Sequence, residues 1–398
     1  MNKLIVTRWN QGILTALQSE EGIIQLNLDP APDSSVLGNI YIGKVKNIVK
    51  NINSAFVEFT NGRMGYYSLA ENRNHIYAKE HSGSFLKAGD EIVVQVSRDS
   101  VKTKAPVLTG NISFPGKYCV LTLGKTVIGF SSKIKNQEWK AAVKQMLPKE
   151  AGTEYGVIIR TNAQDADPDI IINELVSLRE TSSRMLSEAA YRTCFSQLYR
   201  SVPSYISDIR DLNSGLLQEI ITDDSSICQQ LQEYLACFQP EDHQKLTYYE
   251  DKLLPLGKLY SLESVMERAM NKRVWLKSGG YLVIEPTEAL VVIDVNTGKF
   301  SEKKEIRATI LKTNLEAAAE ISRQLRLRNL SGIIIVDFID MERDEDKREL
   351  LTRLEALTAK DPVKTTVVDM TRLNLVEITR KKVRRPLYEQ ASFDRGEE

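Results

Sequence analysis

The chain has 398 residues, of which 42% are hydrophobic and 27% are charged, and its formal net charge is zero. This length predicts about two to four folding units, and the neutral charge excludes a chain that binds nucleic acid through strong overall basicity, so such binding would have to come from local patches. No run approaches 18 consecutive apolar residues and the N-terminus lacks an apolar signal core, which predicts a cytoplasmic protein without a membrane span.

The N-terminal part is predicted to consist of strands. Residues 3–28 alternate apolar and polar side chains around a turn at residues 9–12, which indicates a hairpin or meander. Residues 29–33 carry two prolines between two aspartates and mark a boundary. Short strand patterns with polar turns then predict a small barrel or sandwich. They occupy residues 39–45, 55–59, 65–68 and 91–96.

The rest of the chain is predicted to mix helices and strands. Strands are expected at residues 118–123 and 155–160, with a helix near residues 136–146 between them. Apolar residues at three- and four-residue spacing predict helices over residues 170–200 and 211–237. From residue 280 onward, strand, long helix, strand, helix and strand follow one another, which is typical of an α/β domain with parallel pairing.

The cysteines and histidines point away from zinc binding and from imidazole catalysis. The four cysteines form no C-x-x-C pair and none lies near a histidine at ligand spacing, so we expect buried, reduced thiols and no zinc site. The three histidines lie in no recognisable catalytic setting, which disfavours chemistry that uses two imidazoles as acid and base. These residues are Cys119, Cys194, Cys228 and Cys237, and His75, His81 and His243.

Two aspartates lie at the ends of two predicted buried strands. Residues 290–296 form an apolar run that ends in polar residues, and strand alternation places Asp294 and Asn296 on one face. A helix is predicted over residues 305–328, followed by a second apolar strand that ends at Asp337. The apolar stripe of this helix is Leu311, Leu315, Ala318, Ile321 and Leu325, and Asn329 and Gly332 suit its end.

A β-α-β unit of this kind makes its two strands parallel, so Asp294 and Asp337 would meet at the edge where open α/β sheets bind ligands. Two carboxylates and an amide oxygen are hard ligands that suit Mg²⁺, which can activate water and neutralise charge on a phosphate. The alternative is that each aspartate is only a strand-end residue. Asp340, on the opposite face if the strand continues, is interpreted as a supporting or structural residue.

Several strings in this region resemble the catalytic region of the ribonuclease E/G family. They are TEAL (287–290), IDVN (293–296), NLEAA (314–318), RQLRLR (323–328) and VDFIDM (336–341). The resemblance implies an endoribonuclease in which Asp294 and Asp337 hold Mg²⁺ and Asn296 assists, and which leaves 5′-phosphate and 3′-hydroxyl ends. It also implies that this part has the fold called DNase I-like.

The resemblance extends upstream to the family's S1-like RNA-binding domain, an OB-fold. It is carried by GNIYIGKV (38–45), AFV (55–57) and GY (65–66). It implies that Phe56, Tyr66 and Lys104 grip RNA. Alternation independently puts Phe56 on the polar face of its strand, where an aromatic ring suits base stacking. From the pattern alone, a place for both aromatics in the core stays open.

The string GVIIRT (156–161) resembles the family's sensor for a 5′-monophosphate. It implies that Arg160 and Thr161 bind the terminal phosphate and that Gly116 lines the same pocket, and the donor fork of a guanidinium suits that task. The alternative is a solvated strand edge. Arg372 and the basic run at residues 380–385 are interpreted as phosphate contacts beside the nuclease site, with a solvated face or tail as the alternative.

The resemblance implies a multidomain α/β chain with an inserted barrel. An RNase H-like subdomain would be split into residues 1–34 and 206–270 around an S1-like OB-fold (35–117) and a 5′-sensor subdomain (118–205), with the DNase I-like catalytic subdomain at 271–398. The family's C-P-x-C zinc link and small dimerisation domain do not follow Arg385, so zinc is not expected and a homodimer would form without that link.

Together these features predict a Mg²⁺-dependent endoribonuclease that cleaves single-stranded, A/U-rich RNA and favours 5′-monophosphorylated ends. It would act in RNA decay and RNA processing, including that of ribosomal RNA. The rival function is a non-catalytic RNA-binding protein on the same scaffold, and a weaker rival is a Mg²⁺ phosphoesterase acting on small nucleotides.

Overall fold

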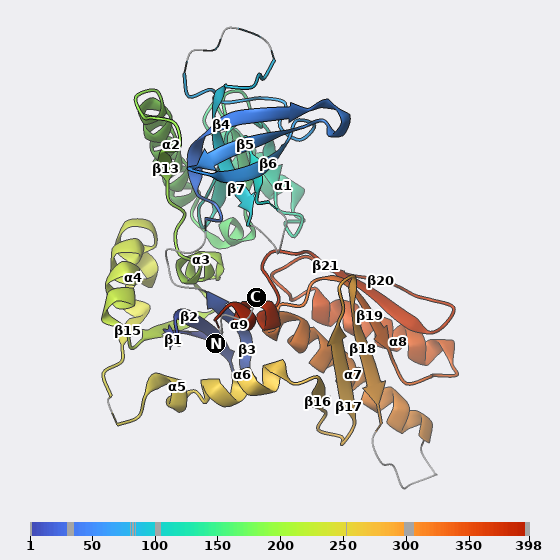
Figure 1. Cartoon of the computed structure of the whole chain (residues 1–398). Coiled ribbons are helices and arrows are strands. Elements are labelled where there is room, and N and C mark those ends of the chain that lie inside the picture. The colour runs from blue at the N-terminus through green and yellow to red at the C-terminus, as the bar shows by residue number, and fades with distance from the viewer. Residues whose placement is uncertain are drawn as a thin grey trace. The chain divides into compact units, whose positions relative to one another are not determined.

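The structure is a computed structural model of the chain. It describes residues 2–29, 36–79, 81, 83, 85–99, 105–251, 253–297 and 306–394. The chain divides into two compact units (Figure 1). The first contains Met1–Ala31, Ser214–Leu235 and Pro240–Glu398, and the second contains Pro32–Asn213 and Ala236–Gln239. None of the helices in these described ranges combines the length and the apolar character that a membrane span requires.

The second unit contains a closed β-barrel. Within the described residues its five strands pair in the order β4-β5-β6-β8-β7, and β7 pairs back onto β4. They are β4 (Ile40–Val49), β5 (Ser54–Thr60), β6 (Arg63–Ser68), β7 (Glu91–Arg98) and β8 (Val107–Thr109), with η1 (Lys50–Ile52) between β4 and β5. Alternate residues of each strand fill the interior, and Gly62, with a φ of 79°, forms the turn into β6. Of the two predicted possibilities, a barrel or a sandwich, the barrel is confirmed, and β8 is a strand that the sequence pattern did not reveal.

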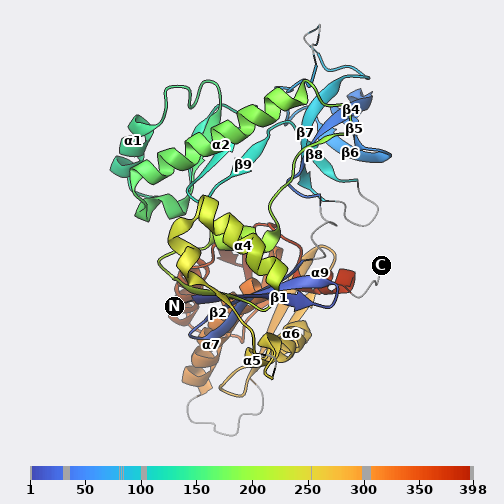
Figure 2. The ribbon, with the colours of Figure 1, turned by 90° about the vertical axis from the view of Figure 1, so that its left-hand side faces the viewer.

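A small sheet in the same unit runs in the order β11-β12-β10-β9. Its strands are β9 (Ser113–Pro115), β10 (Cys119–Thr122), β11 (Ile128–Phe130) and β12 (Gly156–Ile159), and α1 (Gln137–Met146), η2 (Thr161–Asp165), α2 (Pro168–Ala189) and α3 (Ser204–Asp211) accompany it. Figure 2 shows α2 lying along this sheet. The helix predicted over residues 170–200 ends at Ala189, because β13 (Gln197–Tyr199) pairs with β4 of the barrel.

The first unit begins with the predicted meander, which is confirmed as β1 (Asn2–Trp9), β2 (Gly12–Ser19) and β3 (Gly22–Asp29). The full sheet order is β15-β14-β1-β2-β3. The helix predicted over residues 211–237 is wrong in its first half, where β14 (Leu217–Thr222) pairs in parallel with β1, and helix α4 (Ser225–Phe238) follows. The Ile-Ile-Thr end of β14 is β-branched and becomes buried between β1 and β15 (Leu246–Tyr248), an environment that favours a strand.

The second sheet of the first unit carries the predicted β-α-β unit. Its order is β16-β17-β18-β19-β21-β20. The strands are β16 (Arg273–Trp275), β17 (Tyr281–Pro286), β18 (Leu290–Asn296), β19 (Gly332–Asp337), β20 (Thr365–Met370) and β21 (Leu375–Arg380). Of the described strand pairs in this sheet, only β18–β19 is parallel, so the expectation of general parallel pairing is wrong outside the β-α-β unit. The β17–β18 and β20–β21 neighbours are joined by short connections, which antiparallel strands allow.

Two helices, α7 (Ile306–Leu327) and α8 (Asp344–Thr358), pack side by side on this sheet (Figure 1). The predicted stripe of α7 faces the core, with Ala318, Ile321 and Leu325 fully buried. The helix ends where Asn329 and Gly332 adopt positive φ angles of 49° and 92°, as their residue types predicted. The remaining elements are η3 (Pro240–Lys245), α5 (Leu256–Leu259), α6 (Leu262–Met270) and α9 (Leu387–Asp394).

The four cysteines are free thiols. Cys119 and Cys228 are buried, as predicted, and Cys194 is half-buried. Cys237 is exposed, so the prediction of a buried thiol is wrong there. The buried face of α4 is formed by residues four apart, among them Ile227, Leu231 and Leu235, and Cys237 falls off that face.

Candidate active site

The two aspartates at the strand ends are direct neighbours. In the parallel register of β18 and β19, Asp294 lies opposite Asp337. Along β18 the side chains of Val291, Ile293 and Val295 are buried, whereas Asp294 is exposed, so it projects from the face opposite the hydrophobic core. Asp337 is exposed in the same way on β19. We refer to Asp294 and Asp337 as the carboxylate pair.

Asn296 completes the polar end of β18, on the face that alternation predicted. Its Nδ2 donates a hydrogen bond to Oδ2 of Asp294 at 2.7 Å. This bond uses one amide donor and orients the Asp294 carboxylate. The amide oxygen of Asn296 is the atom left to act as a hard ligand.

Negative charge is concentrated around the carboxylate pair. Partial burial raises the pKa of Asp337 above its usual value, and the nearby carboxylates of Asp294 and Asp340 raise it further. Asp340 therefore acts on the pair through its charge, although it follows the end of the strand. A cation beside the pair would relieve this repulsion.

The donor chemistry of this edge fits Mg²⁺. Two carboxylates and an amide oxygen are hard ligands, and Mg²⁺ binds proteins through one or two carboxylates while waters and phosphate oxygens fill its other positions. Within the ranges that the structure describes, no three or more His, Cys, Asp or Glu side chains gather into a group that could hold a metal ion. Two carboxylates leave the remaining positions of such a cation to water and substrate.

Asn314 of α7 binds the backbone of the segment that follows Asp337. No role was predicted for Asn314 from the sequence. Its side chain is fully buried. Its Nδ2 donates to the backbone O of Ile339 at 2.8 Å, and its Oδ1 accepts from the backbone N of Ile339 at 3.1 Å. This clamp holds the segment that links Asp337 to Asp340. A lone amide beside the apolar stripe of a helix is the signal that could have revealed it.

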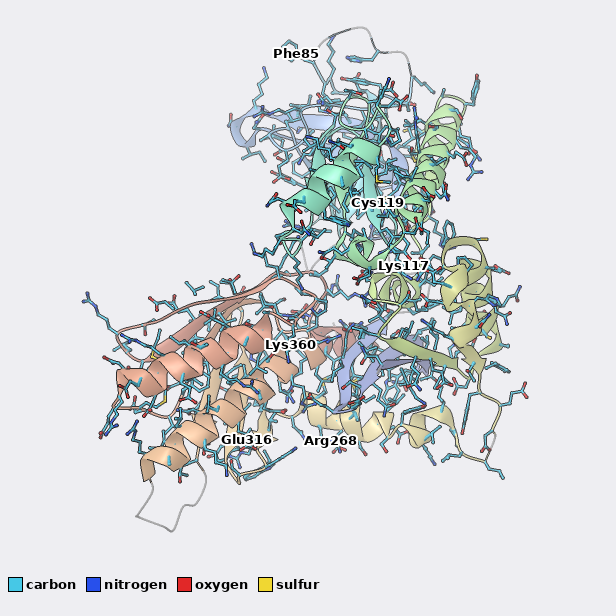
Figure 3. All side chains as sticks on the ribbon, turned by 180° about the vertical axis from the view of Figure 1, so that it is seen from behind. Phe85, Lys117, Cys119, Arg268, Glu316 and Lys360 are labelled. Carbon is cyan, nitrogen blue, oxygen red and sulfur yellow. The ribbon has the colours of Figure 1, made fainter. Side chains whose placement is uncertain are left out.

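Glu316, two residues further along α7, anchors another segment of this sheet (Figure 3). Its carboxylate accepts hydrogen bonds from the backbone N of Lys277 at 2.6 Å and of Ser278 at 3.3 Å. These two residues form the turn between β16 and β17. The NLEAA string therefore contributes two side chains that fix backbone around the sheet.

The two aromatics predicted to hold RNA bases lie outside the barrel core. Phe56 on β5 pairs with Tyr66 on β6, and their rings meet edge to face with centroids 6.3 Å apart. Both are half-buried, whereas their neighbours Val57 and Phe59 are fully buried. The Tyr66 hydroxyl accepts a hydrogen bond from Ser54 at 2.6 Å, which holds the ring in place. The alternative that both rings lie in the barrel core is thus excluded. The third predicted RNA-binding residue, Lys104, lies outside the described residues.

The structure brings two of the three predicted phosphate-sensor residues together in the second unit. Nη1 of Arg160 donates to the backbone O of Gly116 at 2.6 Å. Thr161 is exposed beside Arg160, and its hydroxyl lies 2.9 Å from that of Ser131. A Cβ on Gly116 would collide with the carboxylate of Glu174, which accepts hydrogen bonds from the next three backbone N–H groups. A larger residue at position 116 would have to displace the Glu174 carboxylate from these bonds.

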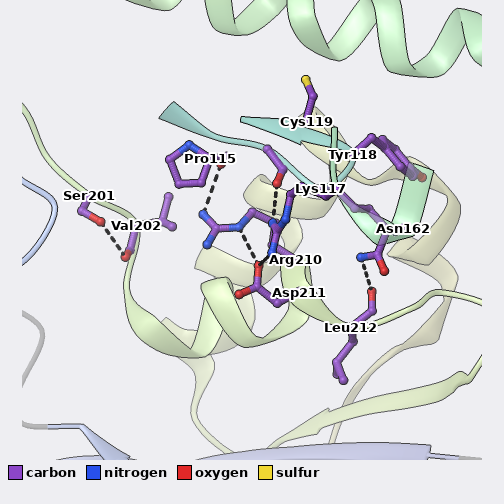
Figure 4. Close-up of polar contacts among 12 residues, drawn as sticks. Pro115, Lys117, Tyr118, Cys119, Asn162, Ser201, Val202, Arg210, Asp211 and Leu212 are labelled. Carbon is purple, nitrogen blue, oxygen red and sulfur yellow. Dashed lines mark hydrogen bonds and ion pairs between the residues drawn. The ribbon is translucent and has the colours of Figure 1, made fainter. Parts of the chain in front are cut away.

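Asp211 is a partner of Arg160 that the sequence did not suggest. Its Oδ1 lies 2.8 Å from Nη2 of Arg160. The same oxygen lies 3.1 Å from Nε of Arg210, and Figure 4 shows this contact. Arg210 is held in turn by the backbone O of Pro115. Burial by itself would raise the pKa of Asp211, but the charges of Arg160 and Arg210 outweigh it and hold the pKa below its usual value. The Arg160 guanidinium is therefore already paired with one carboxylate.

The predicted basic residues divide between the two ends of the sheet. Leu375 pairs with Asp337, so the turn from Thr371 to Asn374, which carries the exposed Arg372, lies beside the carboxylate pair. Arg380 pairs with Gly332 at the other end of β19. The run from residue 380 to 385 thus starts away from the carboxylate pair, and its interpretation as a phosphate contact beside that pair is wrong.

Arg380 also has a structural task. It is almost fully buried, and its Nε lies 2.7 Å from Oδ2 of Asp361. Its Nη1 donates to Oδ1 of Asn329 at 2.9 Å and to the backbone O of Leu330 at 3.1 Å. A buried guanidinium with this set of acceptors ties the end of α7 to the sheet and is closed to substrate.

Comparison with known proteins agrees with the resemblance found in the sequence. The model of the Ribonuclease E/G family matches residues 113–383. The chain belongs to the ribonuclease E/G family. Ribonuclease G of Escherichia coli (strain K12) is 32% identical over 374 residues, which cover 91% of this chain and 76% of that protein. Ribonuclease E of Synechocystis sp. is 33% identical over 363 residues, covering 89% of this chain and 54% of that protein.

Several assignments, most of them roles that were predicted for single residues, do not follow from membership of the ribonuclease E/G family, and they stay predictions. They comprise the metal and RNA roles of the residues above, the sensor role of Arg160, Thr161 and Gly116, and a homodimer without a zinc link. The subdomain names and boundaries also stay predictions. The N-terminal meander and β14–β15 do share one sheet although residues 30–216 separate them in the chain.

Proposed function

We propose that this protein is a Mg²⁺-dependent endoribonuclease that hydrolyses phosphodiester bonds in single-stranded RNA. An endoribonuclease activity follows from its membership of the ribonuclease E/G family, whose similar members are named Ribonuclease G and Ribonuclease E. The observation that carries the metal dependence is the register of β18 and β19, which makes Asp294 and Asp337 direct neighbours on an exposed edge.

The carboxylate pair would hold the metal, and Asn296 would orient Asp294 and offer its amide oxygen to the metal or the phosphate. The chemistry that bound Mg²⁺ supplies at such a site is the activation of water and the neutralisation of charge on the phosphate. Asn314 keeps the Asp337 end of the site in place through its two bonds to Ile339. The expected products carry 5′-phosphate and 3′-hydroxyl ends.

The choice of substrate would come from the second unit. Phe56 and Tyr66 present partly exposed rings on adjacent strands, and such rings stack on bases that are free of a duplex, which supports single-stranded RNA as the substrate. A preference for A/U-rich RNA and for a 5′-monophosphate is part of the proposal. Arg160 supports the latter, because a guanidinium presents a fork of donors to a phosphate, which would have to share or displace the Asp211 carboxylate. The corresponding cellular role is RNA decay and processing.

A cleavage assay with a matched pair of variants tests this proposal. The substrate is an end-labelled, A/U-rich single-stranded RNA with a 5′-monophosphate, incubated in Mg²⁺ or in EDTA. Wild type should cut internally only with Mg²⁺, and Asp294→Asn and Asp337→Asn should each abolish cleavage while still binding the RNA. Asp369→Asn, which changes an exposed carboxylate on the edge strand β20, is the control and should cut normally.

Two outcomes would contradict the proposal. Cleavage by wild type in EDTA would show that the reaction does not depend on Mg²⁺. Wild type that binds the RNA but leaves it intact in Mg²⁺ would favour the non-catalytic RNA-binding protein. A 5′-triphosphate version of the same RNA tests the end preference separately, because it should be cut more slowly than the monophosphate.

A further inference from the structure

A pocket of about 410 Å³ opens beside the carboxylate pair. It is formed by the first turns of α8 and by the turn that joins β20 to β21. It is shallow and open to solvent, which suits a ligand that lies along the surface. The residues that matter for its chemistry are Asp344, Lys347, Arg348, Met370, Arg372 and Asn374. We call this the basic pocket.

The turn that lines the basic pocket leads directly into the strand residue that pairs with Asp337. Leu375, which follows the pocket residue Asn374, pairs with Asp337 across β19 and β21. Nδ2 of Asn374 donates to Oδ1 of Asp340 at 3.1 Å, and Oδ1 of Asn374 accepts from Nζ of Lys347 at 2.9 Å. Asn374 has a φ of 62°, a conformation that asparagine tolerates better than most residues. A chain of polar contacts thus runs from the pocket to the acidic edge.

The charge of the basic pocket suits a phosphate. It holds three cations, Lys347, Arg348 and Arg372, against the single carboxylate of Asp344. The side chains of Arg348 and Arg372 are exposed, and neither forms a hydrogen bond or ion pair with another residue that the structure describes. In a chain with no net charge, this local excess of positive charge makes the pocket a candidate site for an anion.

The pocket also has an apolar component. Met370 lies half-buried in its lining, at the end of β20. A group that carries both a phosphate and a sugar or base would therefore match the basic pocket better than inorganic phosphate alone, because both kinds of surface would be used.

We propose that the basic pocket holds the nucleotide next to the scissile phosphate of the RNA, with its own phosphate on Arg348 and Arg372. This inference rests on the proposed function and adds to it a neighbouring subsite. Lys347 acts as a positioning residue, since it holds Asn374 against Asp340. The pocket then sets the register of the RNA backbone over the carboxylate pair without reading the base.

The first test uses the double variant Arg348→Gln/Arg372→Gln. Its matched control is Arg353→Gln/Lys360→Gln, which removes the same charge from exposed residues in the later part of α8 and directly after it, away from the first turns that line the pocket. The pocket variant should lower kcat/KM about 10-fold at 0.1 M salt, mainly through KM, and its log(kcat/KM) should fall less steeply with log[salt], by about 0.7 for one lost phosphate contact. The control should keep both values.

The second test identifies the phosphate. A neutral methylphosphonate is placed at one phosphate at a time on either side of the cleaved bond. At one of the phosphates adjacent to the cleaved bond, the methylphosphonate should lower the cleavage rate of wild type as much as the double variant lowers the rate on unmodified RNA. The double variant acting on that methylphosphonate RNA should be no slower than with either change alone. Additive effects at every position, or a pocket variant that matches its control, would overturn the subsite.

These outcomes are separable from a failure of the proposed function. If wild type does not cut RNA in Mg²⁺, the endoribonuclease proposal fails at the first step, whatever the pocket does. If wild type cuts and the pocket variant behaves like the control, only the subsite is lost. Far-UV circular dichroism tests whether each variant is folded. Misfolding is not the expected cause of lost activity, because the side chains of Arg348 and Arg372 are exposed.

Discussion

Neutralising one member of the carboxylate pair should stabilise the metal-free protein while it abolishes activity. Asp294→Asn keeps an oxygen that can accept the hydrogen bond of Asn296, so the variant changes charge more than contacts. Adjacent strands lie about 4.8 Å apart, so two carboxylates in register repel each other by about 0.9 kcal/mol at the dielectric of water. Since both side chains are exposed, we expect a gain of about 1 kcal/mol, or about 2–4 °C in Tm for a unit of this size.

The pH dependence of this effect follows from Asp337. Its pKa is raised, so the folded protein binds that proton more tightly than the unfolded chain does, and the energetic penalty appears only as the pH rises through the raised pKa. The extra stability of Asp294→Asn should therefore be present at pH 7.5 in EDTA and should shrink as the pH falls. Mg²⁺ should raise the Tm of wild type and leave that of the variant nearly unchanged, because a ligand stabilises only the fold that binds it.

Thermal melts followed by circular dichroism, in EDTA and across a Mg²⁺ titration, measure both effects. Asp369→Asn is again the control, since it removes a carboxylate from the same sheet without touching the pair. The reasoning is refuted if Asp294→Asn melts at or below wild type in EDTA, or if Mg²⁺ raises the Tm of both proteins equally.

Three further perturbations follow from the same contacts. Asp361→Ala leaves the buried guanidinium of Arg380 without its carboxylate, so the free energy of unfolding measured in urea should fall by about 3–5 kcal/mol, and a loss below 1 kcal/mol would contradict the buried pair. Phe56→Ala should weaken RNA binding in fluorescence anisotropy by about 1–3 kcal/mol with little change in Tm, and an unchanged Kd would argue against stacking. Arg160→Ala should destabilise the protein more at pH 7 than at pH 3. The pKa of Asp211 is depressed, so the ion pair contributes fully above the ordinary carboxyl pKa and its contribution shrinks as the pH falls toward the depressed pKa; equal losses at both pH values would refute this.

The position of the carboxylate pair could be predicted from local sequence patterns. Two apolar runs, each ending in an aspartate and joined by one amphipathic helix, leave little freedom, because a β-α-β unit places its strands in parallel and its strand ends on one edge. The meander, the strands of the barrel and the end of α7 at Asn329 and Gly332 follow in the same way from periodicity and turn residues. Family resemblance supplied the functional roles, which periodicity does not contain.

The sites of Phe56 and Arg160 were predictable only in part. Alternation placed Phe56 on the polar face of its strand, and the closed barrel decided that this face lies outside the core. The acceptor of Arg160, Asp211, is 51 residues away along the chain, and no local pattern joins them. Contacts of this kind depend on how distant segments pack.

Two wrong predictions show what long-range pairing decides. Residues 217–222 satisfy a helical spacing, yet they form a strand because β1 and β15 bury them from both sides. The basic run from Arg380 looks like a solvated or substrate-binding tail, yet β21 pairs with β19 so that Arg380 meets Asp361 and the turn at Arg372 meets the carboxylate pair. The amino-acid sequence determines which residues can be strand, helix or turn, because those preferences arise within a few residues. The partner and register of each strand are set by the burial of surfaces far apart in the chain, and they alone decided which charges reach the candidate active site.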